Sequence, residues 1–330
     1  MLELFVAVAS TGINNRVMTS PDGIVWTTRL SAGDFVWRGI AWSPELQLLV
    51  AVNNSGVLSQ VMTSPNGINW TLRNVPVQKS WNAVVWCKAL KLFIAVSSNT
   101  IAPTIMTSPD GINWTGRSVP GDATQLNNWE SIAWSQDKKI AVAVGPYTLG
   151  NQIALSYDGI NWGIAVKPSV RQWLGVCYAK ELGLFIGFAS NGDIQRVMTS
   201  PDGLNWTGRN AAAANEWISG IWAKELGIVA AVSGGSTAAH VQWSANGINW
   251  NQAGTIDNSL KSIAWSPKLK LFAACSITGP NNRILTSPNG TVWTARTTNS
   301  NDWQSIIWTV APEKNKKIHL GRKMKPRFMV

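Results

Sequence analysis

The chain of 330 residues is poor in the residues on which most metal sites and many enzymes depend: it holds two histidines, three cysteines and three tyrosines. His240 and His319 have no partner at metal-ligand spacing, so we expect no metal site and no cofactor. Cys87, Cys177 and Cys275 are far apart in the chain. This spacing excludes a local metal motif, and the odd number argues against a disulfide framework.

Charged residues are also scarce, at 14%, whereas hydrophobic residues make up 45% of the chain. That composition supplies an ample core, yet no apolar run approaches the roughly 20 residues that span a bilayer. The opening stretch MLELFVAVAS has no basic flank, so we interpret it as a strand and not as a signal peptide. We expect synthesis inside the cell, leave incorporation into a virion open, and assign no localisation.

The net charge of +11 is concentrated at the carboxyl end. We divide the chain into a domain at 1–308 and a basic tail at 309–330. The tail fits three roles: a solvated terminus, an arm on a neighbouring subunit, or a polyanion contact driven by counterion release. Its candidate contact residues are Lys316, Lys317, Arg322, Lys323, Lys325 and Arg327.

What the sequence has in abundance is one repeated phrase, S-P-[DN]-G-x-x-W with small variations, found in seven copies. Successive copies are 43 to 48 residues apart, a period typical of repeat architectures. Proline, Asp or Asn, and glycine in this order predict a tight turn between two strands. The phrase ends in these tryptophans: Trp26, Trp70, Trp114, Trp162, Trp206, Trp250 and Trp293.

Each full repeat contains four strand signals, as in Trp37–Trp42, Leu48–Val52, Val61–Ser64 and Ile68–Thr71. Four short strands per repeat and seven repeats predict an all-β, seven-bladed β-propeller of four-stranded antiparallel blades. The amino terminus lacks a first strand, and residues 303–308 supply a first strand without a blade after it. We therefore predict that 303–308 pairs with 4–8 and closes the ring.

Tryptophans and arginines recur at fixed places in the repeat. Because the seven phrase tryptophans recur once per blade, we interpret them as blade-to-blade packing and not as ligand platforms. Arginines follow the phrase tryptophan by three residues in five copies. We expect this periodic set to stack on aromatic rings or to pair between blades.

The connections differ in kind on the two faces of the predicted disc. One face carries the uniform turns between strands one and two and between strands three and four. The other, which we call the variable-loop face, carries the blade-to-blade connections and the loops between strands two and three, and these differ from copy to copy. Binding usually resides in specialised loops on a rigid frame. The candidate binding residues are Asn14, Asn15, Arg16, Asn99, Tyr147, Asn191, Asp193, Arg196, Asn281, Asn282 and Arg283.

The phrase resembles the Asp-box repeats of sialidase-like propellers, with one residue fewer between Asp and Gly. It is most similar to the SPDG-x-x-W propellers of phage and large-virus proteins. The resemblance covers about residues 1–308 and implies the propeller fold. It does not imply catalysis, because the Asp-box is a turn motif.

The sequence favours a binding or assembly module over an enzyme. The carboxylates outside the repeated turns are scattered, and the three tyrosines offer no paired tyrosine–glutamate nucleophile. We expect a virus- or phage-associated structural or attachment protein that contacts a protein or glycan partner through the variable-loop face. The alternatives are a lectin outside a virion, an intracellular assembly factor and a divergent glycosidase.

Overall fold

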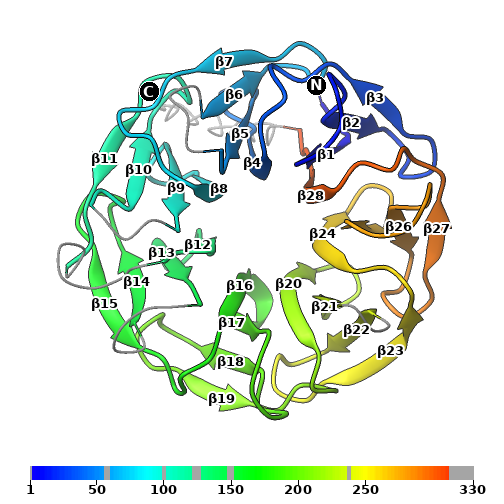
Figure 1. Cartoon of the computed structure of the whole chain (residues 1–330). Helices are drawn as coiled ribbons and strands as arrows, with labels where there is room; N and C mark the ends of the chain where they lie inside the picture. Colours follow the sequence, from blue (N-terminus) through cyan, green and yellow to red (C-terminus); the bar gives the residue numbers. More distant parts are fainter. Residues whose placement is uncertain are drawn as a thin grey trace, which may run out of the picture.

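The computed structural model describes residues 2–55, 60–98, 102–120, 128–146, 152–235 and 239–311. Within these ranges the chain forms seven four-stranded antiparallel sheets arranged around one axis (Figure 1). The helical content of the same ranges is a single 3₁₀ turn, η1 (Lys180–Leu182). The predicted seven-bladed β-propeller is therefore confirmed.

The two strands nearest the axis in each blade are the first two of the repeat. The innermost strands are β28 (Trp303–Trp308), β4 (Trp37–Ser43), β8 (Trp81–Cys87), β12 (Ser131–Ser135), β16 (Trp173–Ala179), β20 (Glu216–Ala223) and β24 (Leu260–Ser266). The second strands are β1 (Phe5–Ala9), β5 (Leu48–Asn53), β9 (Leu92–Ser97), β13 (Ile140–Val144), β17 (Leu184–Ala189), β21 (Ile228–Gly234) and β25 (Leu271–Ser276).

The two outer strands of each blade flank the repeated phrase. The third strands are β2 (Val17–Ser20), β6 (Val61–Ser64), β10 (Ile105–Ser108), β14 (Gln152–Ser156), β18 (Val197–Ser200), β22 (Ala239–Ser244) and β26 (Ile284–Ser287). The outermost strands are β3 (Thr27–Arg29), β7 (Thr71–Arg73), β11 (Thr115–Arg117), β15 (Gly163–Val166), β19 (Thr207–Arg209), β23 (Asn251–Ile256) and β27 (Thr294–Arg296). We number the blades in chain order, with blade 1 formed by β28, β1, β2 and β3.

Blade 1 closes the ring with strands from both ends of the chain. β28 pairs antiparallel with β1, so that Phe5 faces Trp308 and Ala9 faces Trp303. Thr309 extends the seam: its backbone N–H donates to the Leu4 carbonyl oxygen at 2.8 Å, and its hydroxyl accepts the Leu4 N–H at 2.9 Å. The predicted closure is confirmed, with the amino-terminal strand one residue later than expected.

The repeated phrase forms the predicted turn, and blade 1 shows its chemistry. The Ser20 hydroxyl accepts the N–H of Gly23 at 2.8 Å, and the indole N–H of Trp26 donates to the Gly23 carbonyl oxygen at 3.1 Å. Gly23 has a φ of 73°, the left-handed region that favours glycine. The same indole-to-glycine hydrogen bond recurs in all seven blades.

The outermost strand begins later than the sequence suggested. We expected it to start at Ile68 in blade 2, but β7 starts at Thr71. The reason is the side chain of Asn66, whose Oδ1 accepts the N–H groups of both Ile68 and Asn69 at 2.9 Å. Those two N–H groups are therefore unavailable to a strand partner, and the residues belong to the turn.

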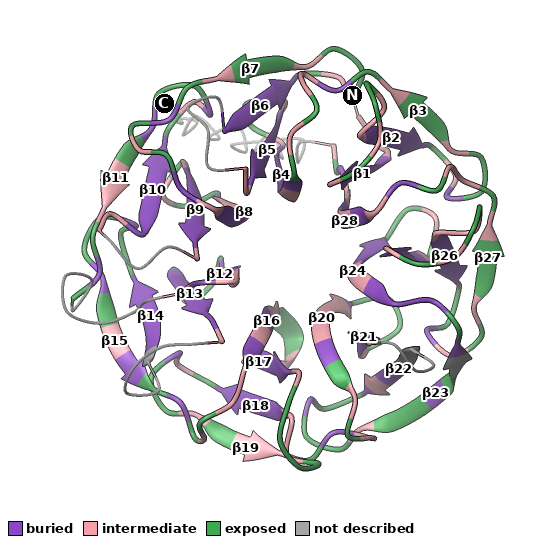
Figure 2. Cartoon of the chain, in the orientation of Figure 1, coloured by how far each residue is buried: buried purple, intermediate pink, exposed green. Residues whose placement is uncertain are grey.

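Seven hydrophobic clusters make up the core, and each one joins two consecutive blades. One of them contains Trp114 of blade 3 together with Val50, Val52 and Val61 of blade 2. Every phrase tryptophan belongs to such a cluster with the preceding blade. Burial is accordingly concentrated in the inner three strands, while the outermost strands are exposed (Figure 2). The predicted blade-to-blade role of these tryptophans is confirmed.

The periodic arginines have a different partner from the one we expected. In each of the five copies Nε donates to the threonine hydroxyl ten residues earlier, as Arg29 does to Thr19 at 3.0 Å. This contact lies within one blade, between the third and outermost strands. The arginines therefore hold the outermost strand onto its own blade.

Candidate functional site

The innermost strands share an irregularity that directs one side chain toward the axis. The inner strand of each repeat begins with a tryptophan, or with Leu260 in blade 7, and we call this residue the first position. In six of the seven blades the pairing with the second strand skips the residue that follows it, as between Trp37 and Gly39 in β4. The first residue, usually tryptophan, stays fully buried between blades. A β-bulge re-aims the extra residue, and here the residue it re-aims lines the central channel.

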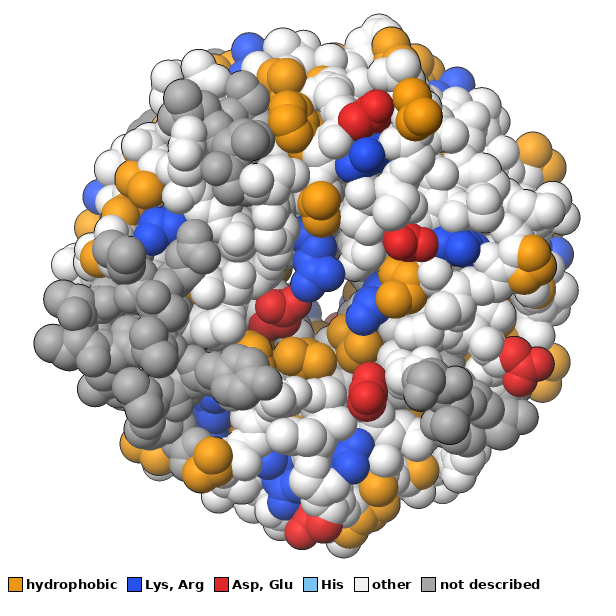
Figure 3. Space-filling view, in the orientation of Figure 1, with side chains coloured by type: hydrophobic (Ala, Val, Ile, Leu, Met, Phe, Trp, Pro, Cys, Tyr) orange, Lys and Arg blue, Asp and Glu red, His pale blue; other side chains and the backbone are white. Residues whose placement is uncertain are grey.

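These residues form a ring to which each blade contributes one side chain. We call it the axial ring: Arg38, Asn82, Glu130, Leu174, Ile218, Lys261 and Gln304. Each member stands near the start of its innermost strand, directly after the blade-to-blade connection. The ring therefore lies at the end of the channel that opens on the variable-loop face, where basic and acidic side chains surround a central opening (Figure 3).

Small residues follow the axial ring and leave room at the axis. The next position holds glycine, alanine or serine in every blade. At Gly175 a Cβ atom would lie 2.1 Å from the Ile218 carbonyl oxygen of the next blade, so no larger residue fits there. The two layers line a cavity of about 310 Å³, which we call the axial pocket. This volume is at the lower end of the range of about 300–1,000 Å³ typical of small-molecule sites.

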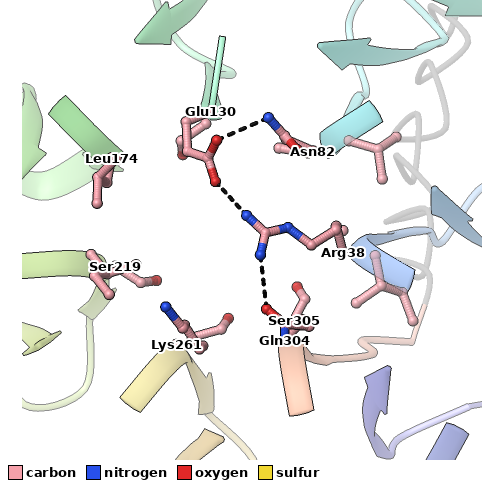
Figure 4. Close-up of a pocket in the computed structure, with 15 residues that line it drawn as sticks. Arg38, Asn82, Glu130, Leu174, Ser219, Lys261, Gln304 and Ser305 are labelled. Carbon is pink, nitrogen blue, oxygen red and sulfur yellow. Dashed lines mark hydrogen bonds and ion pairs between the residues drawn. The ribbon is translucent and has the colours of Figure 1, made fainter. Parts of the chain in front are cut away.

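One side of the axial pocket is a hydrogen-bonded network of four ring members. Arg38 donates from Nη2 to Glu130 Oε1 at 2.8 Å and from Nη1 to Gln304 Oε1 at 3.0 Å. Asn82 donates to the other carboxylate oxygen, Glu130 Oε2, at 2.9 Å. Arg38 thus lies between Glu130 and Gln304 (Figure 4), and both oxygens of the only carboxylate in the described lining are engaged.

The other side of the axial pocket holds a second cation. Lys261 extends into the pocket (Figure 4), and within the described ranges its ammonium makes neither a hydrogen bond nor an ion pair. Burial, followed by repulsion from Arg38, lowers the pKa of Lys261 below its usual range. The apolar ring members Leu174 and Ile218 complete this side.

The three arginines among the predicted binding residues each form hydrogen bonds within their own loops. Arg16, Arg196 and Arg283 each donate from Nε to a carbonyl oxygen three or four residues earlier, at 2.8, 3.0 and 2.7 Å. Arg283 also forms an ion pair with Asp302. These guanidinium groups therefore help to fix the conformation of their loops, and their role in binding a partner stays a prediction.

The predicted residues Asn15 of blade 1 and Arg283 of blade 7 both contact the connection between these blades. Asn301, in the connection between these blades, donates to the backbone and side-chain oxygens of Asn15 at 2.9 and 3.0 Å. Asn14 is exposed and adopts a φ of 57°. Asn281 is exposed, and Asn282 is half-buried.

The predicted residues of blade 5 lie in a separate loop, with blade 6 between them and blade 7. Asp193 pairs with Arg171 at 2.6 Å, and hydrogen bonds with the Gln195 N–H and Arg171 lower its pKa. Asn191 accepts the backbone N–H of Gln172 at 2.8 Å. Asn99, Tyr147 and the six basic tail residues named above lie outside the described residues.

The sequence analysis did not select the axial ring. A signal was nevertheless present in the alignment of the seven copies with one another. The residue after the first inner-strand position is different in all seven copies, whereas the tryptophans and small residues around it recur. Within one repetitive chain, a position at which every copy differs marks a specialised position.

The described residues contain no group of three or more metal-ligating side chains and no helix long and apolar enough to cross a membrane. No protein-family model and no curated protein matches the sequence. The similarity of the SPDG phrase to Asp-box propellers therefore remains a prediction.

Solved structures share the fold at low identity. A streptogramin B lyase superposes with a TM-score of 0.68 at 9% identity, covering 92% of this chain and 91% of that chain. A chain of a nidogen/laminin complex gives 0.59 at 9%, covering 94% and 98%. Hydrazine synthase of Kuenenia stuttgartiensis gives 0.63 at 12%, covering 82% and 88%. The chain is thus a seven-bladed β-propeller, a fold that commonly serves as a binding module.

Proposed function

We propose that the chain is a non-enzymatic binding module that contacts a protein or glycan partner through the variable-loop face, with the axial pocket at the centre of the contact. The observation that carries this proposal is the axial ring. Seven blades built from one repeat place seven different side chains around one opening on that face. A purely structural repeat has no need of such variety at one position.

The chemistry of the axial pocket supports binding over glycoside hydrolysis. Hydrolysis of that kind generally uses two carboxyl groups on either side of the scissile bond. The described lining contributes one, Glu130, and its oxygens are engaged by Arg38 and Asn82; it contributes no tyrosine. The resemblance of the repeat to phage and large-virus propellers extends the proposal to a virus-associated structural or attachment protein.

A matched pair of substitutions tests which face binds. Ile13 is 81% exposed in the β1–β2 loop on the variable-loop face, and Ile24 is 54% exposed in the β2–β3 turn on the opposite face. We expect Ile13→Glu to reduce the capture of partners from extracts of the native source, or of glycans on an array, while Ile24→Glu leaves capture unchanged. The opposite result would show that the partner binds the face that carries the uniform turns. A separate assay with a panel of glycosides tests the non-enzymatic assignment, and hydrolysis of any member would overturn it.

A further inference from the structure

The charges of the axial pocket do not balance. Its described lining holds two cations, Arg38 and Lys261, and one carboxylate, Glu130. Arg38 and Asn82 together occupy both oxygens of that carboxylate. No carboxylate oxygen of the described residues lies within ion-pair distance of the Lys261 ammonium, although Glu130 and the exposed Glu216 act on it from farther away. The pocket therefore carries one uncompensated positive charge.

Two further donors flank this charge. Ser219 of blade 6 and Ser305 of blade 1 line the pocket on either side of Lys261, which belongs to blade 7. Figure 4 shows Ser219 near the amino end of the lysine side chain and Ser305 on the other side of the pocket, next to Gln304. Their hydroxyl groups have no hydrogen-bond partner among the described residues, in contrast to Ser131 and Ser262, which accept backbone N–H groups at 3.2 and 3.3 Å. Three consecutive blades thus contribute unused donors to the lining of the pocket.

We propose that the axial pocket is a carboxylate-binding site, in which Lys261 forms an ion pair with the carboxylate of a ligand and the Ser219 and Ser305 hydroxyls donate to its oxygens. This inference rests on the proposed function, because it assigns a ligand group to the centre of the same face. An ionised carboxylate offers about four acceptor positions on two oxygens and donates nothing. That pattern fits an ammonium flanked by two hydroxyls.

The low accessibility of Lys261 supports the inference independently of the donor count. A partly buried ammonium without a partner is unfavourable, and an ion pair formed away from bulk water is stronger than one at the surface. Leu174 and Ile218, from the two blades before that of Lys261, add apolar side chains to the lining of the pocket. A single bound carboxylate would neutralise the excess charge, whereas a phosphate dianion would reverse it.

The volume of about 310 Å³ limits the ligand to a small organic acid or to one acidic side chain that a larger partner inserts. Both sources present the same carboxylate group.

A calorimetric and NMR titration with two arms distinguishes the two sources. One arm uses propionate and succinate, with propionamide as the neutral match. The other uses the peptide Ac-Gly-Glu-Gly-NH2, with Ac-Gly-Gln-Gly-NH2 as its match.

We expect the wild-type protein to bind the acids and not their amides. Lys261→Met should weaken binding about tenfold or more, because the ligand charge loses its partner, and Lys261→Arg should retain part of it. Lys180→Met removes an exposed lysine from the opposite face and serves as the charge-matched control. Preference for the peptide over the free acids would identify an inserted side chain, and the reverse would identify a small molecule.

Equal binding of acid and amide by the wild-type protein, or no binding of any carboxylate probe at millimolar concentration, would overturn the inference without any variant having to fold. The two proposals fail in different ways. If the probes do not bind while Ile13→Glu still abolishes partner capture, the carboxylate site is wrong and the binding face stands. If the probes bind at Lys261 but substitutions on the variable-loop face leave partner capture unchanged, the carboxylate site is supported and the proposed binding face is wrong.

Discussion

Arg38 of blade 2 donates a hydrogen bond to Glu130 of blade 4 at 2.8 Å, across the mouth of the axial pocket. The two residues are 92 positions apart in the chain, and the intervening blade contributes Asn82 to the same carboxylate. Three blades are therefore tied together at the axis by polar side chains, in addition to the apolar packing between blades. Because this network engages Arg38 and both oxygens of Glu130, Lys261 is the charged side chain of the described lining that is left for a ligand.

The first prediction concerns Glu130. Replacing it by glutamine keeps the shape of the side chain but removes the negative charge that repels a ligand carboxylate and partly neutralises Arg38. We expect Glu130→Gln to bind propionate roughly fivefold more tightly than the wild-type protein, the size of effect expected from one nearby charge in a solvated site. NMR titration measures the change. Glu225→Gln, which removes the same charge from the opposite face, should have no effect; weaker binding by Glu130→Gln would contradict the prediction.

The contact between Arg38 and Glu130 could not be predicted from the sequence, although most of the fold could. Blade number, strand content and ring closure follow from local signals that recur: the turn phrase, the tryptophan spacing and the unmatched strands at the two ends. The pairing of Arg38 with Glu130 follows from no local signal. It depends on the bulge in β4 that turns Arg38 inward and on the radius at which the seven blades close, and both are consequences of tertiary structure.

The loop arginines show a second limit of reasoning from the sequence. Arg16 and Arg283 looked available because they stand in polar, asparagine-rich loops of varying sequence. A loop that must reverse direction without strand partners needs donors for its own carbonyl oxygens, and these arginines provide them. Composition alone does not distinguish an arginine that holds a loop together from one that binds a partner.

The second prediction concerns the stability of the repeated turns in acid. Burial acts to raise the pKa of Asp110, but hydrogen bonds from the Asn113 and Ile112 N–H groups outweigh it and lower the pKa to about 2. Asp158 and Asp202 have equivalent contacts and also a pKa of about 2. In the unfolded chain an aspartate protonates near pH 3.9. The stability from these groups is therefore fully present above about pH 4 and is lost as the pH falls to about 2.

Replacing Asp110, Asp158 and Asp202 together by asparagine should flatten this acid dependence. The turn itself should survive, because Asn66, Asn246 and Asn289 make the same side-chain contacts in three of the other four blades. Urea unfolding at pH values between 2 and 7 gives the free energies of unfolding for both proteins. Asp257→Asn, an exposed residue outside the turns, is the control. Equal acid dependence in the wild-type protein and the triple variant would contradict the assignment.

The third prediction is that the cysteines are unreactive in the folded protein. Cys87 and Cys275 are buried, and Cys177 is half-buried with little solvent around its thiol. Burial raises the pKa of Cys87 well above its ordinary value, and it raises those of Cys177 and Cys275 to about 12. The thiolate is the reactive form, so at pH 8 almost none is present. We expect no reaction with a thiol reagent such as 5,5′-dithiobis(2-nitrobenzoate) in buffer and three equivalents in guanidinium chloride. Rapid modification of the folded protein would show that at least one of these thiols is open to solvent.

The fourth prediction concerns the seam of the ring. Thr309→Val removes the hydroxyl that accepts the Leu4 N–H while keeping the size and the branched shape of the side chain. It leaves that N–H without its partner, and we expect a loss of about 1 kcal/mol in the free energy of unfolding. Thr207→Val, at an exposed position of the outermost strand β19, is the control and should be nearly neutral.

Hydrogen exchange locates the effect of Thr309→Val within the ring. If pairing between β28 and β1 is what closes the propeller, the amide groups of Phe5–Ala9 and Trp303–Trp308 should lose protection in this variant before those of blades 3 to 5. Blades 3 to 5 are continuous in sequence and do not depend on the seam for their own strand pairing. A uniform loss of protection around the ring would instead show that the seven blades open as one unit, and that the seam is no weaker than any other boundary between blades.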